Sequence, residues 1–154
     1  MRCYLTFGKE EAPEGFTALK PSQLSEQADG SVEEIQGPNV IEKIQDLVSF
    51  MEQVHRVLPT GGKAFFASGY YGCVNSYMSP LNVRALSEGS MNWCSKDWRE
   101  QVKFTEIDTK IDFEVAVSFS TDASLNLRSD EVQHLWRTTR LNCVLGVQFT
   151  LTKR

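Results

Sequence analysis

Residues 39–66 read NVIEKIQDLVSFMEQVHRVLPTGGKAFF, and this stretch contains the clearest structural signal in the chain. From Val40 to Leu58 the apolar residues recur with the 3.6-residue period of an amphipathic helix. A proline and two glycines within 59–62 end that pattern. The next run, Lys63 to Ser68, is short and apolar, as is typical of a strand buried in a parallel sheet. We therefore predict a helix from Val40 to Leu58, opened by Asn39, and a central strand after it.

Other β-rich runs predict strands at residues 3–7, 16–19, 32–35, 110–120 and 141–152. Because the last two are long and joined by one loop, we expect them to pair antiparallel at one end of the sheet. Only seven residues separate Gly8 from Phe16, which is too few for a crossover helix. Short helices are predicted at 81–86, 97–101 and 129–137.

The composition is that of an ordinary globular protein. The chain has 154 residues, of which 41% are apolar and 23% charged, so we predict a single domain over 1–154. The formal net charge of -4 gives no signal for nucleic-acid binding.

Targeting and metal-binding signals are missing from the sequence. No apolar run approaches the roughly 18 residues that span a bilayer, and the N-terminus turns acidic early, so we expect a cytoplasmic protein without a membrane segment. The four cysteines are scattered and form no CxxC pair, which predicts reduced thiols and no metal site.

The phrase HRVLPTGG at 55–62, between the predicted helix and core strand, resembles H-R-V-L-K-P-G-G of small class I S-adenosylmethionine-dependent methyltransferases. YLTFGKEEAPEGF at 4–16 is similar to that family's L-N-L-G-C-G loop, and SPLNVRALSEGSM at 79–91 to its D-P-T-H element. NCVLGVQFTLTKR at 142–154 fits its closing strand. The resemblance implies an abbreviated Rossmann-like α/β fold: a three-layer α/β/α arrangement with a mostly parallel sheet and an antiparallel C-terminal hairpin.

The chain departs from the family at the cofactor positions. The family's G-C-G becomes Gly8-Lys9-Glu10, where the Glu10 side chain would block the approach of the cofactor and add a charge beside its carboxylate. The acid that accepts the ribose hydroxyls becomes Lys20, an ammonium that can only donate. The third strand, with its adenine-contacting acid, is expected to be missing. Asn39 replaces the first histidine of H-V-L-E-H.

The substrate side has also changed, because D-P-T-H becomes Ser79-Pro80-Leu81-Asn82. With three family histidines and an aspartate gone, we predict no catalytic residue; His55 is expected to pack against the core. Aromatic residues in irregular sequence predict either a binding surface or a folded-over lid. The candidate binding-surface residues are Tyr70, Tyr71, Tyr77, Asn82, Trp93 and Trp98.

Three hypotheses follow. The first is a methyltransferase-like pseudoenzyme that does not bind S-adenosylmethionine and acts by binding another protein, as a non-catalytic subunit, adaptor or inhibitor, in a homo- or hetero-oligomer. Its small size would suit a virus-encoded protein. The second is an active methyltransferase with a rebuilt S-adenosylmethionine site. The third is a small-anion binder that uses Lys9, Lys20 and Lys43 in the remnant pocket.

Overall fold

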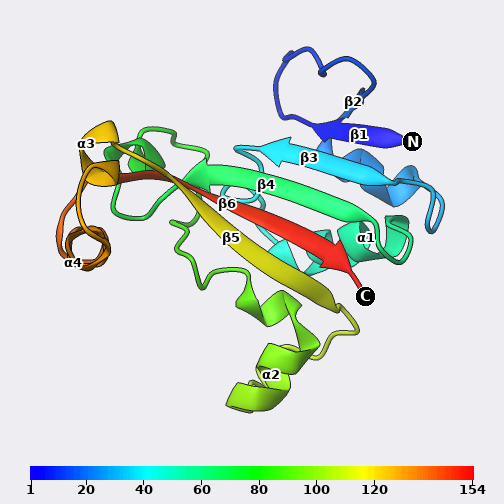
Figure 1. Cartoon of the computed structure of the whole chain (residues 1–154). Coiled ribbons are helices and arrows are strands. Elements are labelled where there is room, and N and C mark those ends of the chain that lie inside the picture. The colour runs from blue at the N-terminus through cyan, green and yellow to red at the C-terminus, as the bar shows by residue number, and fades with distance from the viewer.

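A six-stranded sheet forms the centre of the fold in this computed structural model, which describes residues 1–154. The strands lie in the order β2-β1-β3-β4-β6-β5 (Figure 1). Neighbours among β1 to β4 are parallel, whereas β6 runs antiparallel to β4 and β5. The strand bounds are Arg2–Leu5 (β1), Thr17–Leu19 (β2), Glu34–Pro38 (β3), Lys63–Gly69 (β4), Phe113–Thr121 (β5) and Val144–Lys153 (β6). The predicted Rossmann-like class, with an antiparallel C-terminal hairpin, is confirmed.

Helical segments connect these strands. The predicted helices at 97–101 and 129–137 are confirmed, because α2 contains the first and α4 begins one residue into the second, after its N-cap Ser129. No helix of the chain combines the length and the apolar character needed to cross a membrane. The helical bounds are Pro21–Glu26 (η1), Leu47–Val57 (α1), Val74–Tyr77 (η2), Asn92–Cys94 (η3), Lys96–Val102 (α2), Ala123–Asn126 (α3) and Asp130–Thr139 (α4).

The hydrophobic core lies between the sheet and α1. Met51, Val54 and Val57 of α1 are completely buried, because the 3.6-residue period places them on the side of the helix that faces the strands. In β4, Ala64, Phe66 and Ser68 are buried, and the residues between them, Phe65 and Ala67, are half-exposed. β4 is interior to the sheet, which confirms the central strand predicted for Lys63 to Ser68.

The start of the predicted helix at Val40 was wrong, because α1 begins only at Leu47. Asn39 has a left-handed φ of 52°, and residues 39–43 form turns. The guanidinium of Arg84 donates hydrogen bonds to the carbonyl oxygens of Ile41, Ile44 and Gln45, so these groups are satisfied without an α-helix.

The helix predicted at 81–86 was also wrong. This segment is irregular, and Leu86 instead forms an isolated bridge with Tyr70 beyond the end of β4. The Asn82 side chain donates to the Ser76 carbonyl at 3.0 Å, and Arg84 reaches the turns before α1. These long-range contacts outweigh a local helical pattern that is only two turns long.

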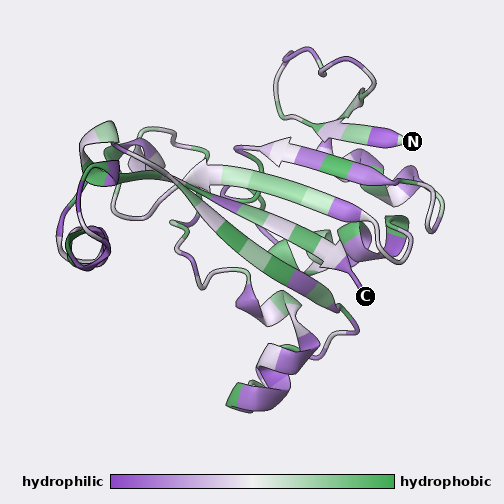
Figure 2. Cartoon of the chain, viewed as in Figure 1, coloured by the Kyte–Doolittle hydropathy of each residue, from purple (hydrophilic) through white to green (hydrophobic).

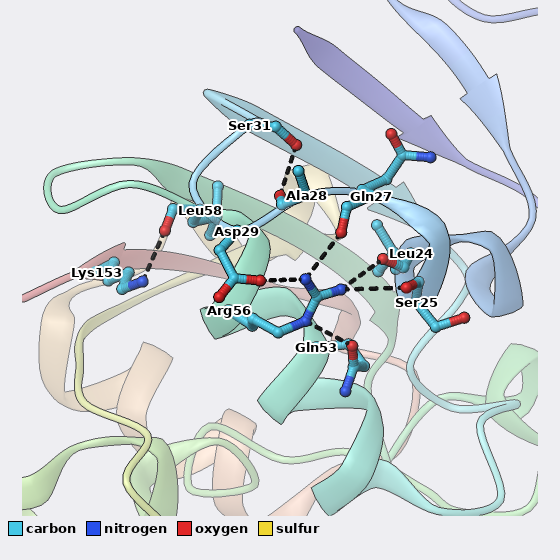
Figure 3. A network of polar contacts seen from close by, with 10 residues as sticks. All are labelled: Leu24, Ser25, Gln27, Ala28, Asp29, Ser31, Gln53, Arg56, Leu58 and Lys153. Carbon is cyan, nitrogen blue, oxygen red and sulfur yellow. Dashed lines mark hydrogen bonds and ion pairs between the residues drawn. The ribbon is translucent and has the colours of Figure 1, made fainter.

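Arg56 anchors the connection from β2 to β3 (Figure 3). From α1, its guanidinium donates to the carbonyl oxygens of Leu24 at 3.1 Å and Gln27 at 2.8 Å, and it forms an ion pair with Asp29. Its Nε donates to Gln53 one turn earlier in α1. This fork of donors holds η1 against the helix.

One face of the sheet has no helical layer. The core residues from α1, η1 and η3 are buried against one face, whereas no side chain that points to the other face from β1, β3 or β4 is buried. In Figure 1 this face is turned toward the viewer, with α1 behind it, and Figure 2 shows polar and apolar residues alternating along β5. The predicted three-layer arrangement was therefore wrong in its third layer. The reason is that eleven residues, Thr6 to Phe16, connect β1 to β2 without a helix.

Candidate functional site

The carboxyl ends of β1, β3 and β4 point to the same edge of the sheet (Figure 1). The chain leaves β1 for β2 on one side and later crosses to β3 on the other, so the strand order reverses at β1 and β3. Open α/β sheets bind their ligands at such a switch point. The five predicted cofactor positions follow three of the parallel strands: Gly8, Lys9 and Glu10 follow β1, Lys20 follows β2 at the edge of the sheet, and Asn39 follows β3.

The loop after β1 folds back on its own strand. The amide of Gly8 donates to the Thr6 hydroxyl at 3.1 Å, and that hydroxyl lies 3.5 Å from Oε2 of Glu10. Burial and the nearby Glu10 carboxylate raise the pKa of Tyr4, the residue two positions before Thr6. A Cβ added to Gly8 would come no closer than 4.0 Å to any other atom. The Glu10 carboxylate therefore lies against the end of β1, and nothing in the chain requires a glycine at position 8.

Lys20 and Lys43 line one cavity, of about 480 Å³, between η1 and α1. The Lys43 ammonium also lies 6.0 Å from the centroid of the Phe7 ring. Lys9 does not line this cavity. Two ammonium groups and several hydroxyl donors in one recess are suited to an anion. The hydroxyls belong to Ser22, Ser25 and Ser49.

Asn39 and Glu42 belong to the turns between β3 and α1. The backbone N–H of Asn39 donates a hydrogen bond to the Ala67 carbonyl at 2.7 Å. The left-handed backbone conformation of Asn39 turns the chain away from the sheet. Glu42 is only 4% exposed, and its Oε2 has no hydrogen-bond partner. Burial raises the pKa of this carboxyl, although a hydrogen bond with Ser68 opposes the shift. Glu42 is a polar residue between the apolar positions of the predicted helix, and no local signal shows its burial, which depends on the break in the helix.

His55 lies on α1, away from the carboxyl edge. Its ring packs edge-on against Phe113 with centroids 5.2 Å apart, and its Nε2 is buried without a partner. Burial, together with the Lys153 ammonium, lowers the pKa of His55. The ring therefore stays neutral at pH 7, in keeping with a packing role.

The structure brings four of the predicted binding-surface residues together beyond the end of β4. Tyr70 is buried, and its hydroxyl donates to Glu88 at 2.7 Å. Tyr77 donates to the Tyr71 carbonyl at 2.9 Å, and Asn82 hydrogen-bonds to the same segment. Trp93 and Trp98 do not join this group. They lie on η3 and α2, where Arg99 donates to the carbonyls of Trp93 and Ile111 beside the start of β5.

Exposed apolar residues gather at the same end of the molecule, where Figure 1 shows α3 and α4 beside the segment after β4. The two segments are tied together, since Asn142 accepts a hydrogen bond from Val74 and donates one to Gly72, both at 2.8 Å. Met78 is 73% exposed and Leu127 is 87% exposed. We use the name carboxyl-end patch for the exposed apolar residues of these two segments, which are Val74, Tyr77, Met78, Leu81, Leu127 and Leu141.

Comparison with known proteins shows the fold. No sequence-family model matches the chain, and no curated protein sequence does. Among solved structures, a SAM-dependent methyltransferase from Archaeoglobus fulgidus is similar over 90% of this chain and 68% of its own, with a TM-score of 0.59 and 13% identity. The chain has the class I methyltransferase fold.

Two further structures support that conclusion. A methyltransferase from Mesorhizobium loti covers 92% of this chain and 72% of its own, with a TM-score of 0.51 and 12% identity. A chain in the Haloferax volcanii complex that contains the Trm112 methyltransferase activator covers 99% of this chain and 72% of its own, with a TM-score of 0.53 and 14% identity. At these identities the likeness concerns the fold and does not extend to the activity.

The buried carboxyl of Glu42 predicts a pH-dependent stability. Its pKa is higher in the folded state than its ordinary value of 4.5, so the free energy of unfolding falls as pH rises from that value through the folded pKa. Glu42→Gln has no carboxyl to ionise and so avoids this loss. Between about pH 4 and pH 7, we expect the free energy of unfolding of the variant to exceed that of the native chain by on the order of 1 kcal/mol or more. Denaturant unfolding at each pH measures it. Glu26→Gln, at an exposed position, should show no such gain; an equal gain there, or none in Glu42→Gln, would contradict the prediction.

Proposed function

We propose that this chain is a methyltransferase-fold protein that does not bind S-adenosylmethionine in the manner of its fold relatives and acts by binding another protein. The observation that carries the proposal is the position of Glu10. Its carboxylate lies against Thr6 at the switch point, where the related loops have glycine and the cofactor approaches the backbone.

The donors and acceptors around the switch point do not suit the cofactor. Lys20, at the end of β2, cannot accept hydrogen bonds from ribose hydroxyls. A carboxylate at Glu10 would lie near the cofactor's own carboxylate, and like charges at about 4 Å repel by roughly 1 to 4 kcal/mol. β2 is the edge of the sheet, so the chain provides no next strand to contact an adenine ring. Together these changes remove contacts from three parts of the ligand.

The carboxyl-end patch is the surface that we propose for the partner. It is apolar and exposed, which is typical of protein interaction sites. Arg128 and Arg140 flank the Trp136 ring of α4, 5.2 and 4.0 Å from its centroid, and add positive charge beside the patch. A partner with an apolar centre and an acidic rim would complement this surface. The Haloferax volcanii complex shows that a chain of this fold occurs with a protein partner.

A second candidate function is anion binding, because one cavity is lined by both Lys20 and Lys43. We expect inorganic pyrophosphate to bind there with an affinity that falls as salt rises. Lys43→Glu should abolish the calorimetric signal, whereas Lys9→Glu, outside the cavity, should leave it. Pyrophosphate binding that is absent, or insensitive to Lys43→Glu, would eliminate this candidate.

The cofactor part of the proposal can be tested by calorimetry. We expect no binding of S-adenosylmethionine or S-adenosylhomocysteine at millimolar ligand by the native chain. Glu10→Gly with Lys20→Asp removes the blocking side chain and restores an acceptor, so binding should strengthen by about tenfold or more, equivalent to about 1.4 kcal/mol. The control variant, Lys9→Asp with Glu11→Gly, replaces one lysine by aspartate and one glutamate by glycine on either side of Glu10. It should not strengthen the binding of either ligand. Micromolar binding by the native chain would overturn the pseudoenzyme assignment.

The partner surface can be tested by site-specific cross-linking. A photoreactive side chain placed at position 78, in place of Met78, should cross-link this chain to its partner protein and give one adduct of defined mass. Leu127→Asp with Leu141→Asp, on the other segment of the patch, should abolish it because both side chains would charge the apolar contact. Val102→Asp changes an exposed apolar residue of α2 and serves as the control. An adduct that survives the patch variants, or none at all, would contradict the proposed surface.

A further inference from the structure

The face of the sheet without a helical layer is the strongest unexplained feature of the fold. Its centre is formed by Tyr4, Glu34, Gln36, Lys63, Phe65 and Thr150, none of which is buried. We call this side of the sheet the open face. Mostly parallel sheets are found with both faces covered, since their strands have little other means of shielding apolar side chains from water. The open face is therefore an incomplete layer.

A hollow of about 230 Å³ lies at the centre of the open face. Tyr4, Gln36, Phe65 and Thr150 contribute to its lining, so aromatic rings and hydrogen-bonding groups meet there. The hollow is small compared with the cavities that hold cofactors, which are about 300–1,000 Å³. Its size is suited to a side chain projecting from a second protein surface.

Charged residues cross the open face in a regular row. The strand register aligns Arg2 of β1 with Glu34 of β3, Glu34 with Lys63 of β4, Lys63 with Thr152 of β6, and Thr152 with Glu114 of β5. The sign alternates from Arg2 to Glu34 to Lys63. Glu34 already accepts from Arg2 at 2.8 Å, whereas Lys63 forms no ion pair within the chain.

The centre of this row, Glu34 beside Lys63, is complementary to itself. We propose that the open face is the contact surface of a symmetric dimer, with the two-fold axis parallel to the strands and between β3 and β4. That axis places Glu34 of one protomer opposite Lys63 of its partner, and the reverse, while Arg2 faces the neutral Thr152. Symmetric interfaces require such self-complementarity.

The next row and the separation of the sheets fit the same axis. In this row Tyr4, Gln36, Phe65 and Thr150 are register neighbours. The axis sets Gln36 opposite Phe65 and Tyr4 opposite Thr150. Packed sheets lie about 10 Å apart, a gap that a lysine and a glutamate can span together. Packed sheets are rotated by about 30° relative to each other, and this rotation shifts residues of one sheet away from those opposite them in the other. Glu34 and Lys63 are shifted least, because they flank the axis.

The size of the open face is sufficient for a modest dimer. Six strands about 4.8 Å apart and roughly five residues long give a face of about 500 Å² in projection. Side-chain relief raises the accessible area toward the roughly 800 Å² per partner of a standard interface. The polar rows keep the separated protomer soluble, so we expect a reversible dimer.

Paired charge reversals test the dimer by sedimentation equilibrium of the full chain over about 1 µM to 1 mM. The native chain should dimerise. Lys63→Glu alone, and Glu34→Lys alone, each place like charges together twice across the axis and should weaken dimerisation by about tenfold or more. An equimolar mixture of the two variants should recover the dimer, because every contact then joins opposite charges. Lys110→Glu, outside the open face, should dimerise like the native chain.

A second variant guards against misfolding of Glu34→Lys, which also loses its bond with Arg2. Thr150→Arg introduces a charge at the hollow without breaking that pair and should likewise leave monomers. Circular dichroism verifies that each variant is folded. A native chain that stays monomeric, a dimer that persists in Lys63→Glu and Thr150→Arg, or folded charge variants whose mixture does not recover the dimer would each overturn the proposal.

Discussion

The length of the connection between β1 and β2 is the constraint on which the rest of this fold depends. Parallel neighbours are normally joined by a crossover of a dozen or more residues, which includes a helix that covers one face of the sheet. Here eleven residues make the same crossing as a loop. The strands still pair in parallel, with Cys3 opposite Thr17, but no helix is left for the open face. The core is consequently built on one side, between the sheet and α1.

Two arginines then stabilise backbone that lies outside regular structure. Arg84 satisfies carbonyls in the turns before α1, and Arg56 satisfies carbonyls in the connection before β3. Buried backbone oxygens without partners are costly, so a planar group with five donors is an efficient replacement for helical hydrogen bonds. Each arginine joins segments about 30 to 40 residues apart, which makes these short connections part of the folded core.

These contacts also explain how far the sequence could be interpreted. The buried strand β4, the body of α1 and the C-terminal hairpin were predictable because period and apolar character are local properties. The start of α1 was not, because the apolar pattern continues through Ile41 and Ile44, whereas Arg84 of a distant segment binds the carbonyls of these residues in turns before the helix. That Glu10 follows β1 and Lys20 follows β2 could be expected from the resemblance, whereas their role at a ligand site stays a prediction. The burial of Glu42 and the shared cavity of Lys20 and Lys43 depend on tertiary structure.

The bare sheet face and the helix-free loop after β1 have one physical origin. A crossover helix after β1 would cover the face and would also direct its N-terminal amides and dipole toward an anionic ligand group. The loop from Thr6 to Phe16 supplies neither. The substitutions Glu10→Gly and Lys20→Asp restore space and a hydrogen-bond acceptor, but they cannot restore the amides of a helix. Any cofactor affinity that they recover must therefore remain below that of a chain with the helix. In the function that we propose, the same shortening accounts both for the loss of cofactor binding and for a surface available for protein contact.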